Sequence, residues 1–197
     1  MRKVGLMVAV VALISTILTG CGPISPATQT QTSTQPSSPQ GGSDRAFSIT
    51  STAFSAGEKI PVKYTCDGQN ISPALNWMGA QSSTAAFALT VDDPDAPGGV
   101  FTHWVIFNIP PDATGLPEAV PKTGKLDDGA IQGNNGARNI GYMGPCPPKG
   151  SPHHYRFTLY ELDRPLDLSA GATKDQVLQA MAGHILGQMQ LVGIYQR

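Results

Sequence analysis

Short apolar stretches that alternate with polar residues recur along the chain from residue 46 onward, and Gly and Pro separate them. The apolar positions are rich in Val, Ile and Phe, with Thr interspersed. Because the side chains of a strand point alternately to the two faces of a sheet, this pattern predicts mainly β structure. We expect strands over residues 46–51, 60–65, 72–77, 84–92, 101–109, 154–163 and 188–195.

One segment near the C-terminus has helical spacing instead. Thr173-Lys174-Asp175-Gln176 matches a capping box, and apolar residues follow at helical intervals at Val177, Leu178, Met181 and Ile185. The predicted helix begins after Thr173, and Gly187 is expected to stop it. His184 then falls in the last turn, where a histidine commonly complements the helix dipole, so we assign it no role.

The N-terminus has the layout of an export signal. Arg2 and Lys3 precede an apolar run over residues 4–18, which ends in Leu18-Thr19-Gly20-Cys21. The run is shorter than the roughly 20 apolar residues that a membrane span needs. We therefore expect a signal peptide over residues 1–20, cleavage before Cys21 and lipid attached to that cysteine. The alternative is an ordinary signal peptide with an incidental cysteine.

Residues 21–45 are predicted to form a lipidated tether. After Cys21 the chain is almost wholly Gly, Pro, Ser, Thr and Gln up to residue 43. Such a segment cannot bury enough apolar surface to fold. The protein would be lipid-anchored in the cell membrane or the outer membrane, and it would face the periplasm or the cell exterior. Residues 46–197 have the usual size of one domain.

Charge excludes one class of partner. Removing Arg2 and Lys3 from the 13 basic residues leaves 11 against 14 acidic ones, a formal charge of −3. Nothing in this balance recruits nucleic acid. The sequence also contains no internal repeat and no Gly-rich phosphate loop that leads into a helix.

Three predicted strands bring a titratable residue to one rim of the core. Asp93 continues the apolar row of strand 84–92, and His153 precedes the row that contains Tyr155. In strand 101–109, alternation places His103 on the same face as Val105 and Phe107. Singly, each residue suits an ordinary core histidine or an Asp-Pro turn. Together they indicate mutual hydrogen bonding or a ligand site, because buried polar groups are costly unless they are paired.

A stiff loop adds a fourth element at Gly144-Pro145-Cys146-Pro147-Pro148-Lys149-Gly150. Its three prolines fix φ and remove three donors, so few amides, that of Gly144 among them, are left to face an anion. A proline-rich surface turn without function is the alternative.

In their order and spacing, the motifs of this domain resemble those of the phosphatidylethanolamine-binding proteins, also called Raf kinase inhibitor-like proteins, in their bacterial branch. The matching stretches are Tyr64-Thr65-Cys66-Asp67-Gly68, Ser72-Pro73, Asp93-Pro94-Asp95-Ala96-Pro97, His103-Trp104, Gly144-Pro145-Cys146-Pro147-Pro148, His153-His154-Tyr155 and Leu159-Tyr160-Glu161-Leu162-Asp163. The resemblance implies a mainly β fold, an antiparallel β-sheet sandwich with a few peripheral helices. It also implies a small anion pocket lined by Asp93, Asp95, His103, Gly144, Pro147, Pro148, His153 and Tyr155. Alternation sends His154 to the other face, so it is not assigned.

The resemblance implies a non-enzymatic binder of a small phosphate-like anion or a phospholipid headgroup. An inhibitor or scaffold for a protein partner such as a hydrolase is the second hypothesis, and a hydrolase is the third. The sequence has neither a His-Glu-x-x-His zinc motif nor a Gly-x-Ser-x-Gly nucleophile elbow. We expect no catalytic residue, no metal and no cofactor. The identity of a protein partner and the formation of a homodimer stay open.

Cys66 and Cys146 are the two cysteines left once Cys21 is lipidated. Export permits a disulfide between them, and such a closure would stabilise the fold by about 4 kcal/mol in the chain-entropy account. Two free thiols are the alternative, because spacing alone does not bring the residues together.

Overall fold

A computed structural model describes residues 46–197 of the protein. The predicted signal peptide over residues 1–20, the lipidated Cys21 and the tether over residues 21–45 lie outside the described residues. Within residues 46–197, no helix is long and apolar enough to cross a membrane.

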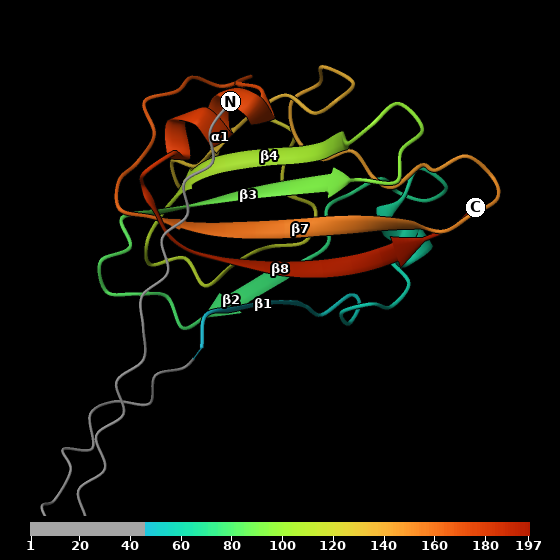
Figure 1. The fold of residues 1–197 in the computed structure, drawn as a ribbon, viewed down its shortest axis with the longest axis horizontal. Coiled ribbons are helices and arrows are strands. Elements are labelled where there is room, and N and C mark those ends of the chain that lie inside the picture. Colours follow the sequence, from blue (N-terminus) through green and yellow to red (C-terminus); the bar gives the residue numbers. More distant parts are fainter. Residues whose placement is uncertain (1–45) are drawn as a thin grey trace, which may run out of the picture. The chain divides into compact units, whose positions relative to one another are not determined.

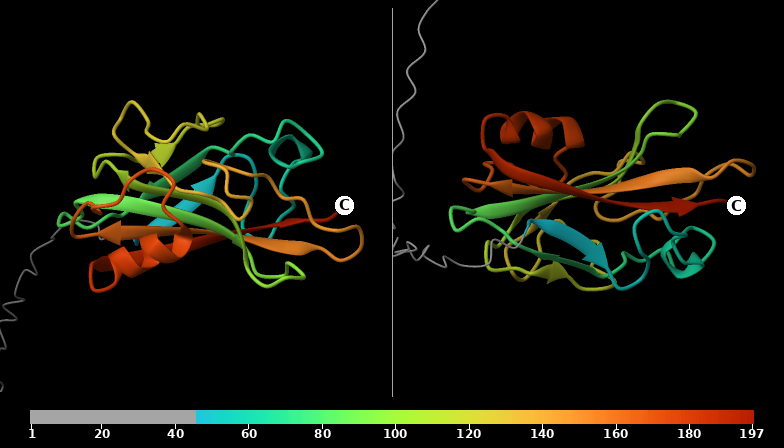
Figure 2. Two further views of the ribbon diagram at one scale, coloured as in Figure 1. Left: turned by 90° about the horizontal axis from the view of Figure 1, so that it is seen from above. Right: turned by 60° about the horizontal axis from the view of Figure 1, so that its bottom comes forward.

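A five-stranded antiparallel sheet forms the centre of the domain (Figure 1). Its strands, in spatial order, are β6 (Ile131–Gln132), β4 (Phe101–Ile109), β3 (Ala86–Asp93), β7 (His153–Leu162) and β8 (Ile185–Tyr195). A three-stranded sheet of β1 (Ser48–Ser51), β2 (Leu75–Met78) and β5 (Gly115–Leu116) covers one face. Helix α1 (Lys174–Met181) covers the other face, as Figure 2 shows. The predicted antiparallel β-sheet sandwich is therefore confirmed.

Both faces of the central sheet are buried, each against a core of its own. The core between the two sheets contains Phe87, Leu89, Trp104, Tyr155 and Phe157. The second core, beneath α1, contains Ala88, Val105, Phe107, Val177 and Met181. Six consecutive residues of β3 are buried, because its two faces contribute to different cores. Only its end, at Asp93, carries a charged side chain into a buried position.

The pairing of β3 with β4 contains a bulge at His103. Val91 pairs with Trp104, whereas the next residue of β3, Asp92, pairs with Thr102. His103 is thus the extra residue of β4. A bulge places two successive side chains on nearly the same side of a sheet.

This bulge makes the predicted face of His103 wrong. Alternation placed His103 on the same face as Val105 and Phe107. In the structure, Val105 and Phe107 belong to the core beneath α1. The His103 ring instead meets Tyr155 edge-on, with ring centroids 5.1 Å apart, on the side of the core between the sheets. Alternation failed because it assumes an uninterrupted ladder.

Two predicted elements also differ from the structure. Residues 60–65 form no strand; a short 3-10 helix, η1 (Val62–Tyr64), follows Pro61 there. Helix α1 starts after the predicted capping box at Thr173 but ends at Met181, because Ile185 pairs with Leu162 as the first residue of β8. The short strands β5 and β6 were not predicted, since two residues give no detectable alternation.

Gly193 in β8 allows the side chains of Ile60 and Phe54 to pack closely against the central sheet. A methyl group added there would lie 2.6 Å from Cγ1 of Ile60 and 2.7 Å from Cε2 of Phe54. We predict that Gly193→Ala lowers the free energy of unfolding by about 1–3 kcal/mol, the usual cost of overpacking. Gly98→Ala is the matched control, because nothing lies within 4 Å of an added methyl group there. Urea titration of both variants tests this, and equal stabilities would contradict it.

Candidate functional site

A pocket of about 220 Å³ lies at the end of the central sheet where β3 ends and where β4 and β7 begin. This is the end that holds the C-terminus in Figure 1. The lining residues are Asp93, Ala96, Pro97, Phe101, His103, Met143, Cys146, Pro147, Pro148 and His153. The three strand ends therefore bring Asp93, His103 and His153 together at one pocket.

Asp93 and His153 form a buried pair at the base of the pocket. The Nδ1 atom of His153 lies 2.7 Å from Oδ2 of Asp93, and both residues are buried. The other carboxylate oxygen of Asp93 accepts the backbone N–H of Asp95 at 2.9 Å. Because a carboxylate accepts, Nδ1 of His153 carries the proton and Nε2 remains for a ligand.

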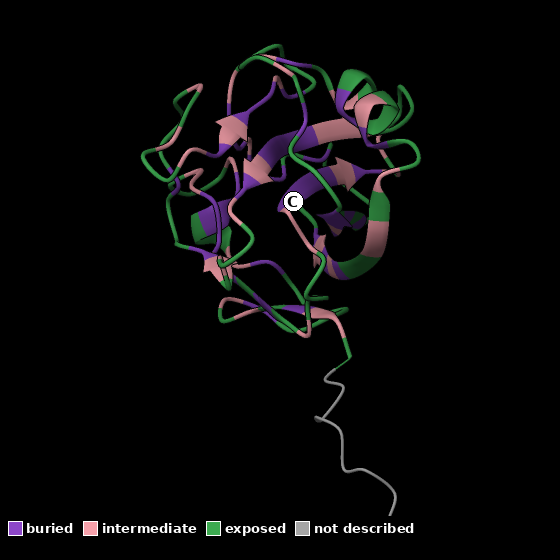
Figure 3. Ribbon diagram, turned by 90° about the vertical axis from the view of Figure 1, so that its left-hand side faces the viewer, coloured by how far each residue is buried: buried purple, intermediate pink, exposed green. Residues whose placement is uncertain are grey.

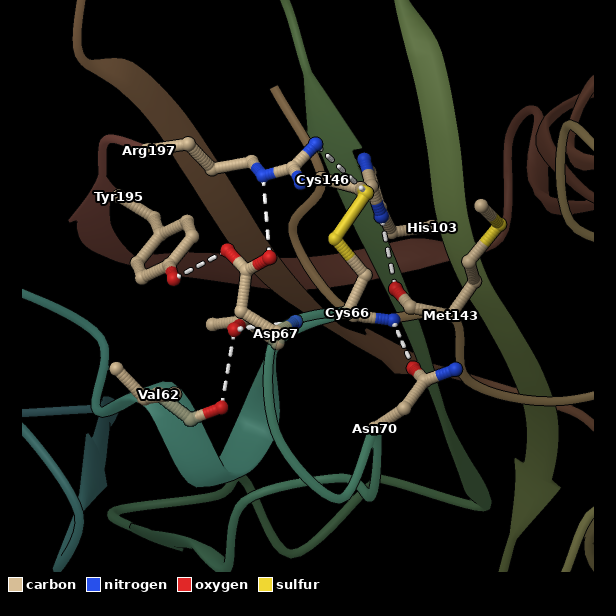
Figure 4. The surroundings of a disulfide bond; sticks show 11 residues. Val62, Cys66, Asp67, Asn70, His103, Met143, Cys146, Tyr195 and Arg197 are labelled. Atoms are coloured by element: carbon tan, nitrogen blue, oxygen red, sulfur yellow. Dashed lines mark hydrogen bonds and ion pairs between the residues drawn. A yellow bond between two sulfur atoms is a disulfide. The ribbon is translucent and has the colours of Figure 1, made fainter. Parts of the chain in front are cut away.

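His103 is fixed by reciprocal bonds to Met143. Its Nδ1 atom donates to the Met143 carbonyl oxygen at 2.8 Å, and its own carbonyl accepts the Met143 N–H at 2.9 Å. Figure 4 shows this ring beside the disulfide. Burial lowers the pKa of His103, even though the Met143 carbonyl and the Asp93 carboxylate act in the opposite direction. The ring is therefore neutral near pH 7, and its Nε2 is a hydrogen-bond acceptor.

Tyr155 packs edge-on against His103 and is completely buried, so it lies behind the pocket and is not among the residues that line it. Its hydroxyl has no hydrogen-bond partner within residues 46–197. Burial raises its pKa, and the nearby Asp93 carboxylate raises it further. The hydroxyl thus stays protonated and keeps a donor to offer, and a buried unpaired donor is costly unless a ligand or water satisfies it.

Asp95 and Gly144, both predicted to line the pocket, have other partners. Oδ2 of Asp95 accepts the backbone N–H of His154 and lies 2.8 Å from its ring Nδ1, on the exposed side of β7. These bonds lower the pKa of Asp95. The amide of Gly144 donates to Oδ1 of Asn70 at 2.7 Å, so it is not available to an anion. Gly144 is needed for packing instead, since an added methyl group would lie 2.4 Å from the Tyr64 carbonyl oxygen.

The proline-rich loop forms one wall of the pocket and is held at several points. A disulfide joins Cys66 to Cys146 across a sequence separation of 80. The Cys66 amide donates to the Pro145 carbonyl at 3.0 Å. Next to it, Asp67 pairs with Arg197 at 3.1 Å and accepts the Tyr195 hydroxyl at 2.8 Å (Figure 4). The wall is therefore tied to both η1 and the C-terminal end of β8.

Five lining residues were not predicted to line the pocket, and one of them, Cys146, was predicted only as a possible disulfide partner. Ala96 and Pro97 lie in the quoted Asp-Pro-Asp-Ala-Pro stretch, and Phe101 lies in the same strand row as His103. No sequence signal identifies Met143, because its backbone carbonyl orients His103. No group of three or more His, Cys, Asp and Glu side chains within the described part of the chain is arranged to hold a metal ion.

Comparisons with known proteins match most of the domain. The family model named phosphatidylethanolamine-binding protein matches residues 50–196. A UPF0098 protein of Methanothermobacter thermautotrophicus is 57% identical over 145 residues, which cover 74% of this chain and 95% of that protein. A Mycobacterium tuberculosis protein named "Putative lipoprotein LppC" is 42% identical over 151 residues, 76% of this chain and 72% of that one. The crystal structure of CT736 from Chlamydia trachomatis, described as a homologue of phosphatidylethanolamine-binding proteins, has a TM-score of 0.72 and 39% identity, with 79% and 99% of the two chains covered.

Proposed function

This chain belongs to the phosphatidylethanolamine-binding protein family, and from this premise we propose that its domain binds a small phosphate-like anion without chemical conversion. One observation carries the proposal. His103 and His153 both line a pocket of about 220 Å³, and each has its Nδ1 atom fixed by a protein acceptor. Their Nε2 atoms are thus oriented in advance and left to a ligand, which reduces the entropy cost of binding.

The protonation of these groups favours a ligand that carries a proton. Neutral His103 offers an acceptor, whereas the Tyr155 hydroxyl offers a donor. The monoanion of a phosphate monoester has one P–OH group to donate and several oxygens to accept, so it complements both. A phosphate dianion would meet the Asp93 carboxylate without a proton between them, unless His103 took one up on binding. The complex therefore holds an added proton in both cases, whether the monoanion binds or the dianion binds and His103 takes up a proton.

No serine, threonine or free cysteine is among the described residues that line the pocket. The Cys146 sulfur that lines it is in a disulfide, and burial keeps the Tyr155 hydroxyl protonated. Other lining residues include Ala96, Pro97 and Met143, which offer no side-chain acid or base. This chemistry supports binding over catalysis.

A phospholipid headgroup and a soluble phosphate monoester share this chemistry. The ammonium of an ethanolamine headgroup would add an ion pair with Asp93. Two experimental arms separate the sources: phosphoethanolamine in solution, and vesicles that contain phosphatidylethanolamine in phosphatidylcholine. Binding to phosphoethanolamine without vesicle binding would assign a soluble ligand.

Membrane anchoring through Cys21 is a second part of the proposal. It is supported by residues 18–21 and by the mycobacterial relative, which is named as a lipoprotein. Two or more acyl chains give stable attachment, whereas one chain binds only marginally.

The neighbouring histidines 153 and 154 provide a matched test of the pocket. We predict that His153→Gln weakens the binding of phosphoethanolamine about 10- to 100-fold, because it removes a hydrogen bond to a charged ligand. His154→Gln should change affinity less than about twofold, since His154 bonds to Asp95 on the exposed side. Titration calorimetry measures both affinities, and thermal unfolding checks that both variants fold. Equal losses in the two variants would refute the assignment of the pocket.

The pH dependence of binding follows from the protonation argument. In the empty pocket the pKa of His103 lies below its ordinary 6.5, and a phosphate monoester loses its second proton at about pH 6. Above these two pKa values, the complex holds more protons than the free protein and the free phosphate monoester hold together. Affinity should therefore fall as pH rises from about 6 to 8, by up to about tenfold per pH unit for one proton. Calorimetry in two buffers of different ionisation enthalpy should detect proton uptake at about pH 7.5; flat affinity without uptake would contradict the account.

For the anchor, we predict that Cys21→Ser moves the full chain from the membrane fraction to the soluble fraction. Mass spectrometry of the wild-type N-terminal peptide should show Cys21 at its start with acyl chains attached. A variant that stays in the membrane, or a wild-type peptide that lacks acyl mass, would show that Cys21 is not the anchor.

A further inference from the structure

The disulfide between Cys66 and Cys146 lies at the rim of the candidate pocket. Cys146 lines the pocket and is exposed, whereas Cys66 is half-buried in the loop that follows η1. Figure 4 shows the disulfide beside the His103 ring, with the Arg197 guanidinium on its other side. Nη1 of Arg197 lies 3.8 Å from Sγ of Cys146. The disulfide is therefore open to a reductant at the edge of the pocket.

Residues 146–149 of the pocket wall depend on this disulfide for their position. Within the described part of the chain, none of their backbone groups makes a hydrogen bond, and two of the four residues are prolines without an amide to donate. The flanking residues are held independently: the Pro145 carbonyl accepts the Cys66 amide, and the Gly150 carbonyl accepts the Gln196 side chain. Beyond side-chain packing and one weak N–H···S contact, the disulfide is what fixes this segment.

The histidines of the pocket do not depend on the disulfide. Met143 orients His103, and Asp93 orients His153, through hydrogen bonds that reduction of the disulfide leaves in place. Three of the ten lining residues belong to the wall segment, and they are Cys146, Pro147 and Pro148. Reduction would therefore release one wall of the pocket without removing the groups that are proposed to contact the anion.

We propose that the Cys66–Cys146 disulfide is a redox-modification site that controls ligand binding, so that the reduced chain binds at least about tenfold more weakly than the oxidised chain. This inference rests on the proposed function. Its physical basis is preorganisation, because a wall that is already fixed loses little conformational freedom when the ligand binds. In the reduced chain, residues 146–149 must be ordered at the moment of binding, and the affinity falls by the cost of ordering them.

The reductant that this step requires is a protein dithiol. Its thiolate attacks Sγ of Cys146, the more exposed cysteine, and the bond to Cys66 breaks. Cys66 leaves as a thiolate and takes up a proton. The second thiol of the reductant then resolves the mixed disulfide and releases Cys146 as a thiol. Two electrons and two protons pass to this chain, and the reductant ends as a disulfide.

Titration calorimetry of the full chain with phosphoethanolamine tests this control of binding. The oxidised chain should bind, the chain reduced with dithiothreitol should bind at least about tenfold more weakly, and reoxidation should restore the affinity. The double variant Cys66→Ser with Cys146→Ser should bind weakly whether or not dithiothreitol is present. Thermal unfolding checks that each sample is folded at the temperature of the titration.

Gly187→Ala is the matched control for a general loss of stability. Gly187 lies in the half of β8 that is farther from the pocket, and Figure 3 shows this half as largely exposed. An added methyl group would collide with Oε2 of Glu161, which is buried and whose other carboxylate oxygen accepts the Gln81 amide. The variant should unfold at a lower temperature, bind phosphoethanolamine as the wild type does, and still lose affinity on reduction.

Limited digestion with trypsin tests the release of the wall without any ligand. Lys149 is exposed at the end of the wall segment, and Lys125 is exposed in a loop outside the candidate pocket. Reduction should increase cleavage after Lys149 at least about fivefold relative to cleavage after Lys125, because a released segment enters a protease more readily than a fixed loop. An equal increase at both sites would show a general loss of structure and would contradict the proposal.

The proposed function and its redox control fail in different ways. An oxidised chain that does not bind phosphoethanolamine would refute both. Equal affinities of the oxidised and reduced chains would refute the redox control alone. If Gly187→Ala lost as much affinity as the double cysteine variant, the disulfide would act through overall stability, and the proposal would also be wrong.

Discussion

The reciprocal hydrogen bonds between His103 and Met143 connect the fold to the candidate site. They exist because β4 bulges at His103, which directs this ring toward Tyr155 while Trp104 stays in the core between the sheets. Met143 in turn leads into the proline-rich loop, so the same contact positions one wall of the pocket. Without the bulge, His103 would face the core beneath α1, and the pocket would lose an acceptor.

Burial and fixed proton positions together determine what the pocket can bind. The Asp93 carboxylate and the Met143 carbonyl each hold one histidine Nδ1, so both rings present Nε2. Burial keeps His103 neutral and the Tyr155 hydroxyl protonated. A site of this kind does not attract anions through positive charge alone. We propose that it favours a phosphate group that shares a proton, which would distinguish it from a cluster of surface lysines.

Much of this arrangement could be predicted from the sequence where strands are regular. The bounds of strand 101–109 were predicted correctly, and alternation along strands 84–92 and 154–163 correctly brought Asp93 and His153 to one rim. The face of His103 could not be predicted, because a bulge depends on pairing between strands. The same holds for the end of α1, where pairing of Ile185 with Leu162 overrides helical spacing. Asp95 lies beyond the last residue of β3, so strand alternation does not define its direction.

The tautomers of the two histidines are the most direct test of this account. Long-range proton–nitrogen NMR spectra distinguish a protonated Nδ1 from a protonated Nε2 in each ring. We predict that both His103 and His153 carry the proton on Nδ1 in the free protein at about pH 7.5, and that phosphate shifts the Nε2 resonances alone. A proton on Nε2 in the free protein, or Nε2 resonances that do not respond to saturating phosphate, would contradict the central claim that these rings are pre-oriented for an anion.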